Sequence, residues 1–157
     1  MIKVLFVCLG NICRSPLAEA IFNHKINQKG LKSAVIADSS GTSNYHIGEA
    51  PDPRTIEIAE KNNIKIHHFG QQFKKKHADE FDYLVAMDAS NRQNMIREIG
   101  SEPDFLYQMR TFDDIGKGGD VPDPYYGGAD GFQKMYEILD RSCENLLQFI
   151  IKKHHLQ

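Results

Sequence analysis

The first fifteen residues constrain the fold of this chain more than any other stretch. Residues 2–7, IKVLFV, form an almost continuous apolar run, which is typical of a strand buried on both faces of a parallel sheet. After a short loop, Ser15 and Pro16 predict an N-cap and a first helical position. Apolar residues then recur at a spacing of four, as one buried helix face requires: Leu17, Ala18, Ile21 and Phe22.

The rest of the chain is predicted to alternate strands with helices. Short apolar runs predict strands around residues 34–38, 83–87 and 105–109. Helical patterns cover residues 52–62 and 90–99 between them. Such alternation predicts right-handed crossovers and a parallel sheet, which is an α/β fold.

The last segment carries the clearest helical pattern. From Phe132 to Ile150, apolar residues keep i, i+3/i+4 spacing without proline or glycine, so one helix face is expected to pack on the sheet. Cys143 belongs to that apolar stripe, which favours core packing over chemistry. Since 157 residues is near the usual size of one domain and no linker interrupts the chain, we expect a single domain over residues 1–157.

Composition and charge narrow the function classes. A formal net charge of -2 gives no general attraction for nucleic acid or acidic lipid, and no apolar run approaches the length of a membrane span. The first strand begins at once, which leaves no room for a targeting signal ahead of it. Three cysteines are too few and too odd in number for a secreted disulfide framework. We therefore expect a cytoplasmic protein without nucleic-acid or membrane partners.

The segment CLGNICRS, residues 8–15, places a cysteine and an arginine around five residues, between the predicted strand and helix. A loop of this length can turn its backbone N–H groups inward as an anion nest, and the helix N-terminus adds its positive end. Gly10 is expected to permit a backbone angle that other residues resist, and the planar fork of Arg14 can bind two phosphoryl oxygens without a metal. Beside Cys8, the predicted phosphate-binding loop consists of Leu9, Gly10, Asn11, Ile12, Cys13, Arg14 and Ser15.

The positive field of this loop stabilises Cys8 as a thiolate, which can attack phosphorus and form a phosphocysteine. A second group must then protonate the leaving oxygen. Asp123 is the candidate, because Pro124 biases it toward an extended backbone and stiffens a glycine-rich loop that can hold its carboxyl. The neighbouring tyrosines, Tyr125 and Tyr126, can form walls for a phenyl ring.

CLGNICRSP near the N-terminus and DPYYGG near the C-terminus together resemble the low-molecular-weight protein tyrosine phosphatases. The segment DSSGTSNY at residues 38–45 also matches in order and spacing, and the resemblance covers essentially the whole chain. It implies a three-layer α/β/α fold with a four-stranded parallel sheet and the phosphate loop between the first strand and the first helix. It further implies hydrolysis of phosphotyrosine and small aryl phosphates through a phosphocysteine, with no cofactor.

Carried onto matching positions, the resemblance makes Cys8 the nucleophile, Arg14 the phosphate ligand, and Asp123 the acid that later activates water. It also implies that Ser15 hydrogen-bonds and activates the thiolate.

For the remaining site residues the resemblance implies supporting roles. Asn11 is expected to hold the strained shape of the loop through contacts that include Ser39. Tyr45 is expected to face Tyr125 across the mouth of a deep slot, so that phosphotyrosine is preferred over the shorter phosphoserine. The expected substrates are tyrosine-phosphorylated proteins, and we expect a monomer.

Alternative functions share parts of this pattern. Thioredoxin-coupled arsenate reductases have this fold and a similar loop, but they need relay cysteines, which are missing after the third strand. A non-hydrolytic phosphate-binding or carrier module would not need Asp123. The adjacent histidine pairs, residues 67–68 and 154–155, lack further ligands at suitable spacing, so no metal site is predicted. Finally, the pair Cys8 and Cys13 predicts reversible inactivation by peroxide through a disulfide.

Overall fold

The computed structural model describes residues 1–126 and 128–156, in which a four-stranded parallel sheet is surrounded by helices. The strand order is β2-β1-β3-β4, and β1 pairs along its full length with β2, from Ile2 opposite Val35 to Cys8 opposite Gly41. The predicted α/β class and parallel sheet are confirmed. The strands are β1 (Ile2–Cys8), β2 (Val35–Gly41), β3 (Tyr83–Ala86) and β4 (Leu106–Gln108).

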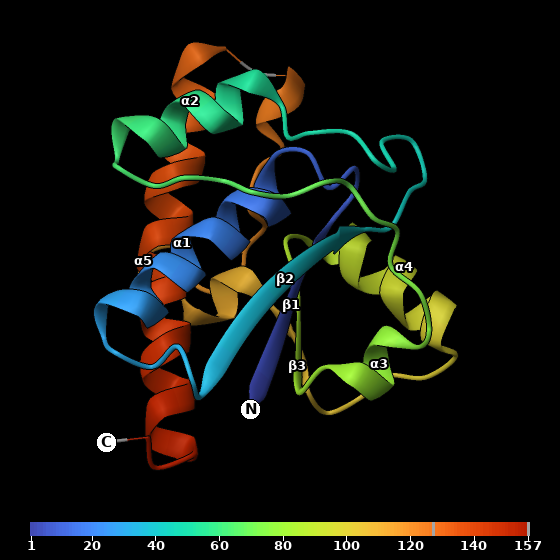
Figure 1. Ribbon diagram of the computed structural model, residues 1–157. Helices are drawn as coiled ribbons and strands as arrows, with labels where there is room; N and C mark the ends of the chain where they lie inside the picture. The colour runs from blue at the N-terminus through green and yellow to red at the C-terminus, as the bar shows by residue number, and fades with distance from the viewer. Residues whose placement is uncertain (127, 157) are drawn as a thin grey trace.

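Helices cover both faces of the sheet, which confirms the three-layer arrangement (Figure 1). One layer contains α1 and α5, with α2 near the top of the view, and the other contains α3 and α4. The α-helices are α1 (Arg14–Gln28), α2 (Pro53–Lys61), α3 (His77–Glu80), α4 (Ala89–Ile99) and α5 (Ala129–Lys153), and the short 3-10 helices are η1 (Met109–Phe112) and η2 (Pro124–Tyr126).

Two apolar cores follow from the alternation of side chains along β1. Val4 and Phe6 point into the larger core, which includes the apolar faces of α1 and α5. Leu5 and Val7 point into the smaller core, where Met95 of α4 packs. Because successive strand residues face opposite sides, an apolar run without alternation marks a strand that is buried on both faces.

The sheet topology locates the site. From β1 the chain crosses to β2 on one side and later to β3 on the other, so the winding direction changes at β1. In parallel α/β sheets, ligands bind beyond the carboxyl ends of the strands at such a switch point. The loop that follows Cys8 lies at this position.

The start of α1 differs from the prediction. The helix begins at Arg14, with Cys13 in the N-cap position and Pro16 as the third helical residue. Ser15 does not cap the helix, because its hydroxyl lies against Cys8 and donates to the carbonyl oxygen of Ser40. A tertiary contact has therefore replaced the local cap that the sequence predicts.

The other differences are small. β2 extends to Gly41, beyond the predicted residue 38, because it pairs with β1 up to Cys8. The helix α3 was not predicted, since four residues are too few for a periodic pattern. The core position of Cys143 on α5 is confirmed, and burial raises the pKa of its thiol. No helix in the described residues combines the length and hydropathy needed to span a membrane.

Candidate active site

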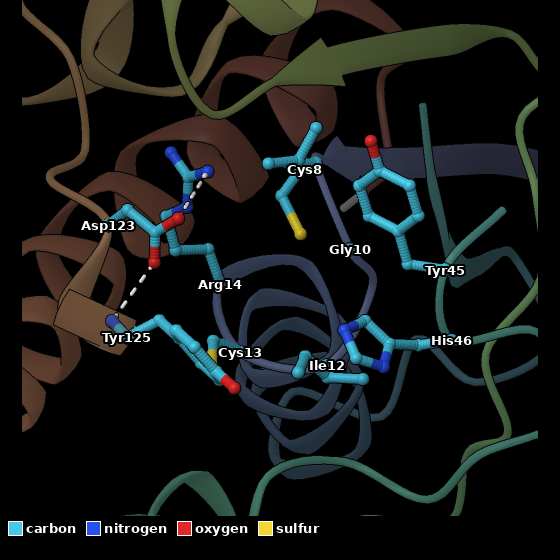
Figure 2. A pocket seen from close by; sticks show the side chains of 10 residues that line it. Cys8, Gly10, Ile12, Cys13, Arg14, Tyr45, His46, Asp123 and Tyr125 are labelled. Carbon is cyan, nitrogen blue, oxygen red and sulfur yellow. Dashed lines mark hydrogen bonds and ion pairs between the residues drawn. The ribbon is translucent and has the colours of Figure 1, made fainter. Parts of the chain in front are cut away.

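A pocket opens at the carboxyl end of β1, between the loop that follows the strand and two loops from distant parts of the chain (Figure 2). It brings together the predicted nucleophile, phosphate ligand, acid and aromatic rim. Its lining residues are Cys8, Leu9, Gly10, Ile12, Cys13, Arg14, Tyr45, His46, Asp123 and Tyr125.

The sulfur of Cys8 lies on the floor of this pocket. Cys8 ends β1 and is buried. Its Sγ lies 3.0 Å from the Ser15 hydroxyl and accepts a hydrogen bond from the backbone N–H of Asn11 at 3.3 Å. These two contacts fix the position of the sulfur within the pocket.

Asn11 holds the shape of the phosphate loop, which we define as residues 8–15. Its φ is 57°, and Gly10 does not have the left-handed conformation that the sequence predicts for it. Instead, a Cβ at Gly10 would lie 3.1 Å from the ring of His46. Among non-glycine residues, asparagine tolerates the left-handed region best.

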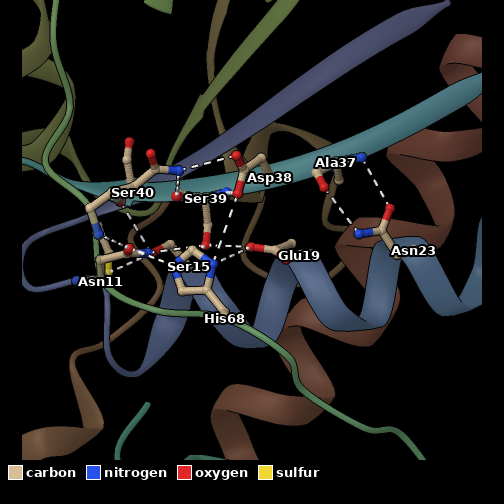
Figure 3. A network of polar contacts seen from close by, with 11 residues as sticks. Asn11, Ser15, Glu19, Asn23, Ala37, Asp38, Ser39, Ser40 and His68 are labelled. Atoms are coloured by element: carbon tan, nitrogen blue, oxygen red, sulfur yellow. Dashed lines mark hydrogen bonds and ion pairs between the residues drawn. The ribbon is translucent and has the colours of Figure 1, made fainter. Parts of the chain in front are cut away.

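The side-chain amide of Asn11 is fully engaged (Figure 3). Its Nδ2 donates to Ser15 Oγ at 2.8 Å and to Ser39 Oγ at 3.0 Å, so the expected contact with Ser39 is confirmed. Its Oδ1 accepts from the backbone N–H of Gln71 at 2.9 Å and lies 2.7 Å from His68 Nε2. The loop is thereby tied to two separate segments of the chain, β2 and residues 68–71.

His68, to which the sequence analysis assigns no role, supports this network. Its Nδ1 lies 3.1 Å from Glu19 Oε1, and the same oxygen accepts a hydrogen bond from Ser39 at 2.7 Å. Within residues 1–126 and 128–156, one group of potential metal ligands lies close together, namely Glu19, Asp38 and His68. Two of its members, Glu19 and His68, already pair with one another, and no metal site is inferred from them.

Arg14 is the first residue of α1, and its guanidinium is buried beside the pocket. Its Nη1 donates to Asp88 Oδ2 at 2.7 Å and to the carbonyl oxygen of Val121 at 3.0 Å. Burial acts to lower the pKa of Arg14, but the negative charge of Cys8 and the bonded Asp88 carboxylate raise it above its ordinary value. The guanidinium is therefore a permanent cation with a fixed orientation.

Asp88 is a second residue whose role the sequence did not reveal. It is the N-cap of α4, where its Oδ1 accepts from the backbone N–H of Asn91 at 2.7 Å. Its other oxygen orients Arg14. An aspartate before a helix is an ordinary capping signal, but its contact with Arg14 spans 74 residues of sequence and leaves no local signal.

Asp123 lies beside Arg14 at one side of the pocket (Figure 2). Its Oδ2 lies 3.6 Å from Arg14 Nη2, its Oδ1 accepts from the backbone N–H of Tyr125 at 3.0 Å, and its side chain is 31% exposed. Tyr45 and Tyr125 both border the opening, on opposite sides of Cys8. The predicted side-chain position of Tyr126 lies outside what the structure describes.

Cys13 also lines the pocket, and its thiol is buried. Burial raises the pKa of Cys13 to about 12. Cys13 is therefore held as a neutral thiol near neutral pH. Both are free in this structure.

A buried thiol that accepts a loop N–H, beside a fixed guanidinium and a carboxylate, is the type of arrangement that cysteine-dependent phosphoryl transfer requires. The family model described as low molecular weight phosphotyrosine protein phosphatase matches residues 3–156, and the chain belongs to that family.

Individual relatives agree over nearly the whole chain. A Saccharomyces cerevisiae protein described as a low molecular weight phosphotyrosine protein phosphatase is 44% identical over 151 residues, covering 94% of this chain and 94% of its own. A Schizosaccharomyces pombe protein of the same description is 41% identical, covering 95% of this chain and 97% of its own. The crystal structure of YfkJ from Bacillus subtilis superposes with a TM-score of 0.92 at 39% identity, covering 98% of this chain and 96% of that one. The chain is a protein tyrosine phosphatase by these relationships.

Proposed function

We propose that this phosphatase hydrolyses phosphotyrosine in two steps, with Cys8 as nucleophile, Arg14 as phosphate ligand and Asp123 as general acid and base. The observation that carries this assignment is the position of the Cys8 sulfur, which meets the Ser15 hydroxyl and the Asn11 N–H on the floor of the pocket. Arg14 and Asp123 border the same floor.

In the first step the Cys8 thiolate attacks phosphorus in line with the leaving oxygen. The S–P bond forms as the P–O bond to the tyrosine breaks, and Asp123 gives its proton to that oxygen, so tyrosine leaves neutral. The backbone N–H groups of the loop and the Arg14 fork bind the equatorial oxygens and stabilise their charge. Because Asp88 fixes Arg14 at 2.7 Å, no reorganisation of the cation is needed.

In the second step Asp123, now a carboxylate, takes a proton from water as the water oxygen attacks phosphorus. The S–P bond breaks, inorganic phosphate is released, and the Ser15 hydroxyl hydrogen-bonds to the returning thiolate. Apart from the substrate and water, both steps use only groups of this chain. The mechanism therefore needs no metal or cofactor.

Tyr45 and Tyr125 are proposed to enclose the phenyl ring of the substrate, which supports tyrosine-phosphorylated proteins as the physiological class. A phosphoserine side chain is too short to carry its phosphate from the aromatic rim to Cys8. We also propose that the chain is a single domain, that the protein is a monomer, and that it is located in the cytoplasm.

The test is turnover of p-nitrophenyl phosphate by wild type and Cys8→Ser, each with and without EDTA. Wild type should turn over many equivalents and keep its rate in EDTA, because Arg14 and the loop N–H groups supply the charge that a metal would bring. Cys8→Ser should be inactive. Cys143→Ser is the matched control, since it removes a cysteine outside the pocket.

Other outcomes identify the alternatives. Loss of activity in EDTA that a divalent ion restores would refute the metal-free mechanism. A single stoichiometric release of p-nitrophenol without turnover would indicate a carrier module. Thioredoxin-dependent arsenate reduction without aryl phosphate hydrolysis would indicate a reductase.

A further inference from the structure

The ring of Tyr125, one wall of the pocket, contacts a cation from a distant helix. The guanidinium carbon of Arg54, on α2, lies 5.5 Å from the centroid of the Tyr125 ring and 4.7 Å from that of Phe132 on α5. Both distances are within the range of cation–π attraction. Arg54 thus bridges the rings on either side of the segment that joins η2 to α5.

Arg54 is itself held in a fixed orientation by Asp52. Its Nε and Nη2 donate to the two carboxylate oxygens of Asp52 at 3.1 Å and 2.9 Å. This is the bidentate geometry that gives guanidinium–carboxylate pairs their directional specificity. The hydrogen bonds from Arg54 hold the pKa of Asp52 below its ordinary value, so the pair stays charged near neutral pH.

Asp52 connects this pair to the phosphate loop. Its backbone N–H donates to the carbonyl oxygen of Ile12 at 2.8 Å, and its side chain caps α2 by accepting from the backbone N–H of Arg54 at 2.8 Å. A continuous series of contacts therefore runs from Ile12 through Asp52 and Arg54 to the ring of Tyr125.

The opposite wall is held differently. The side chain of Tyr45 is 72% exposed, against 43% for Tyr125. In the part of the chain that the structure describes, no ring or cation contact of this kind involves Tyr45. One wall of the slot is thus fixed relative to the phosphate loop, while the other projects into solvent.

We propose that Arg54 is a positioning residue, which fixes the Tyr125 ring at a set distance from the phosphate loop and so makes the slot select flat aromatic phosphate esters. The inference rests on the proposed function, since it concerns the substrate of the same site. A bound phosphate sets the height of the attached phenyl ring, and a wall at a defined distance from the loop can pack against that ring. The charge of Arg54 is already neutralised by Asp52, so recognition of acidic substrate residues is not its role.

The test compares the aryl substrate with the bare anion. For Arg54→Gln we expect KM for p-nitrophenyl phosphate and for a phosphotyrosine peptide to rise about two- to fivefold, the range that an exposed cation–π contact allows. We expect kcat and the inhibition constant of inorganic phosphate to stay the same, because the phosphate loop is intact. Arg54→Lys keeps a cation without the bidentate fork and should give a smaller rise in KM.

Lys61→Gln is the matched control, because Lys61 is an exposed cation on α2 that pairs with Glu57 outside the pocket. It should leave every constant unchanged. In the Tyr125→Ala background, Arg54→Gln should have no further effect on KM, which a general loss of stability would not produce.

Two outcomes would overturn the inference while leaving the proposed function standing. One is an equal weakening of phosphate inhibition in Arg54→Gln, and the other is an undiminished KM effect without the Tyr125 ring. Absence of turnover in wild type would instead refute the proposed function, and the inference with it.

Discussion

The phosphate loop and the acid loop, residues 120–126, meet at one pocket but are held in different ways. In the phosphate loop, Asn11, Arg14 and Ser15 are at most 3% exposed and bond to several elements of the fold. The Asp123 side chain is 31% exposed, and it contacts Arg14 at 3.6 Å and the backbone N–H of Tyr125, two residues along the chain, at 3.0 Å. The fold thus preorganises the anion site, while the acid depends on a short local segment.

The acid loop is nevertheless anchored at its start. The backbone N–H of Val121 donates to the carbonyl oxygen of Met87, and Asp120 accepts from the backbone N–H of Ala89. Val121 is buried and also receives the hydrogen bond from Arg14. Beyond this anchor the loop can adjust the carboxyl to the leaving oxygen. Binding and protonation should therefore be separable by mutation.

The largest separation is expected for Asp123→Asn. Removing a positioned general acid typically costs about 10² to 10⁴ in rate, so kcat for phenyl phosphate should fall in that range. Binding of vanadate should be nearly unchanged, because the phosphate loop does not depend on Asp123. Rapid-quench kinetics and vanadate inhibition measure the two quantities on the same samples.

The leaving group provides the control. The penalty of Asp123→Asn should shrink for p-nitrophenyl phosphate, whose leaving oxygen needs less protonation. Equal losses for phenyl and p-nitrophenyl phosphate would mean that Asp123 has a structural role and that the two loops are not separable in this way.

Asn11→Ala, in the phosphate loop, is expected to have a smaller effect, which weakens the binding of phosphate and not the protonation of the leaving group. This change removes the acceptor of the Gln71 backbone N–H and a hydrogen-bond donor to the hydroxyls of Ser15 and Ser39, at about 1 to 3 kcal/mol for a group left unsatisfied. The left-handed φ of 57° adds strain for alanine. Thermal unfolding should report the loss of stability, and phosphate inhibition should weaken.

Asn11→Gly separates the two causes. Glycine accepts the left-handed backbone at little cost but cannot replace the amide. Phosphate inhibition as tight in Asn11→Gly as in wild type would show that the hydrogen-bond network does not organise the loop, and that the backbone conformation alone is sufficient.

The two regions also differ in how far the sequence predicts them. Residues 2–22 contain the buried strand, the anion loop, the nucleophile, the arginine and the following helix in one continuous segment, so local rules were sufficient for the β1–loop–α1 unit. The predicted start of α1 is wrong by two residues, because Ser15 bonds within the site instead of capping the helix. A local rule fails where a tertiary contact uses the same atom.

The supporting residues could not be predicted from local patterns. His68 reaches Asn11 across 57 residues of sequence from a segment without regular structure, and Asp88 reaches Arg14 across 74. The contacts of Arg54 with the rings of Tyr125 and Phe132 likewise have no local signal. These roles depend on where the folded chain brings distant segments together, which spacing along one sequence does not encode.

The smallest expected effect concerns oxidised enzyme, where the phosphate loop itself must open. Peroxide converts the Cys8 thiolate to a sulfenic acid, and attack by the Cys13 sulfur then forms a disulfide and releases water. Burial raises the pKa of Cys13 to about 12, so this attack needs the loop to rearrange and expose the second thiol. Bound phosphate should slow inactivation, because it holds the loop closed and covers Cys8.

Wild type and Cys13→Ser should therefore recover differently when peroxide treatment is followed by dithiothreitol. Without the second thiol, the sulfenic acid proceeds to irreversible acids, so Cys13→Ser should regain a smaller share of its own untreated activity. Mass spectrometry of the wild-type protein before reduction should find a peptide that joins Cys8 to Cys13, and Cys143→Ser should still form it. Equal recovery in both proteins, with no such peptide, would show that the rigid hydrogen bonds of the phosphate loop keep the two sulfurs apart even after Cys8 is oxidised.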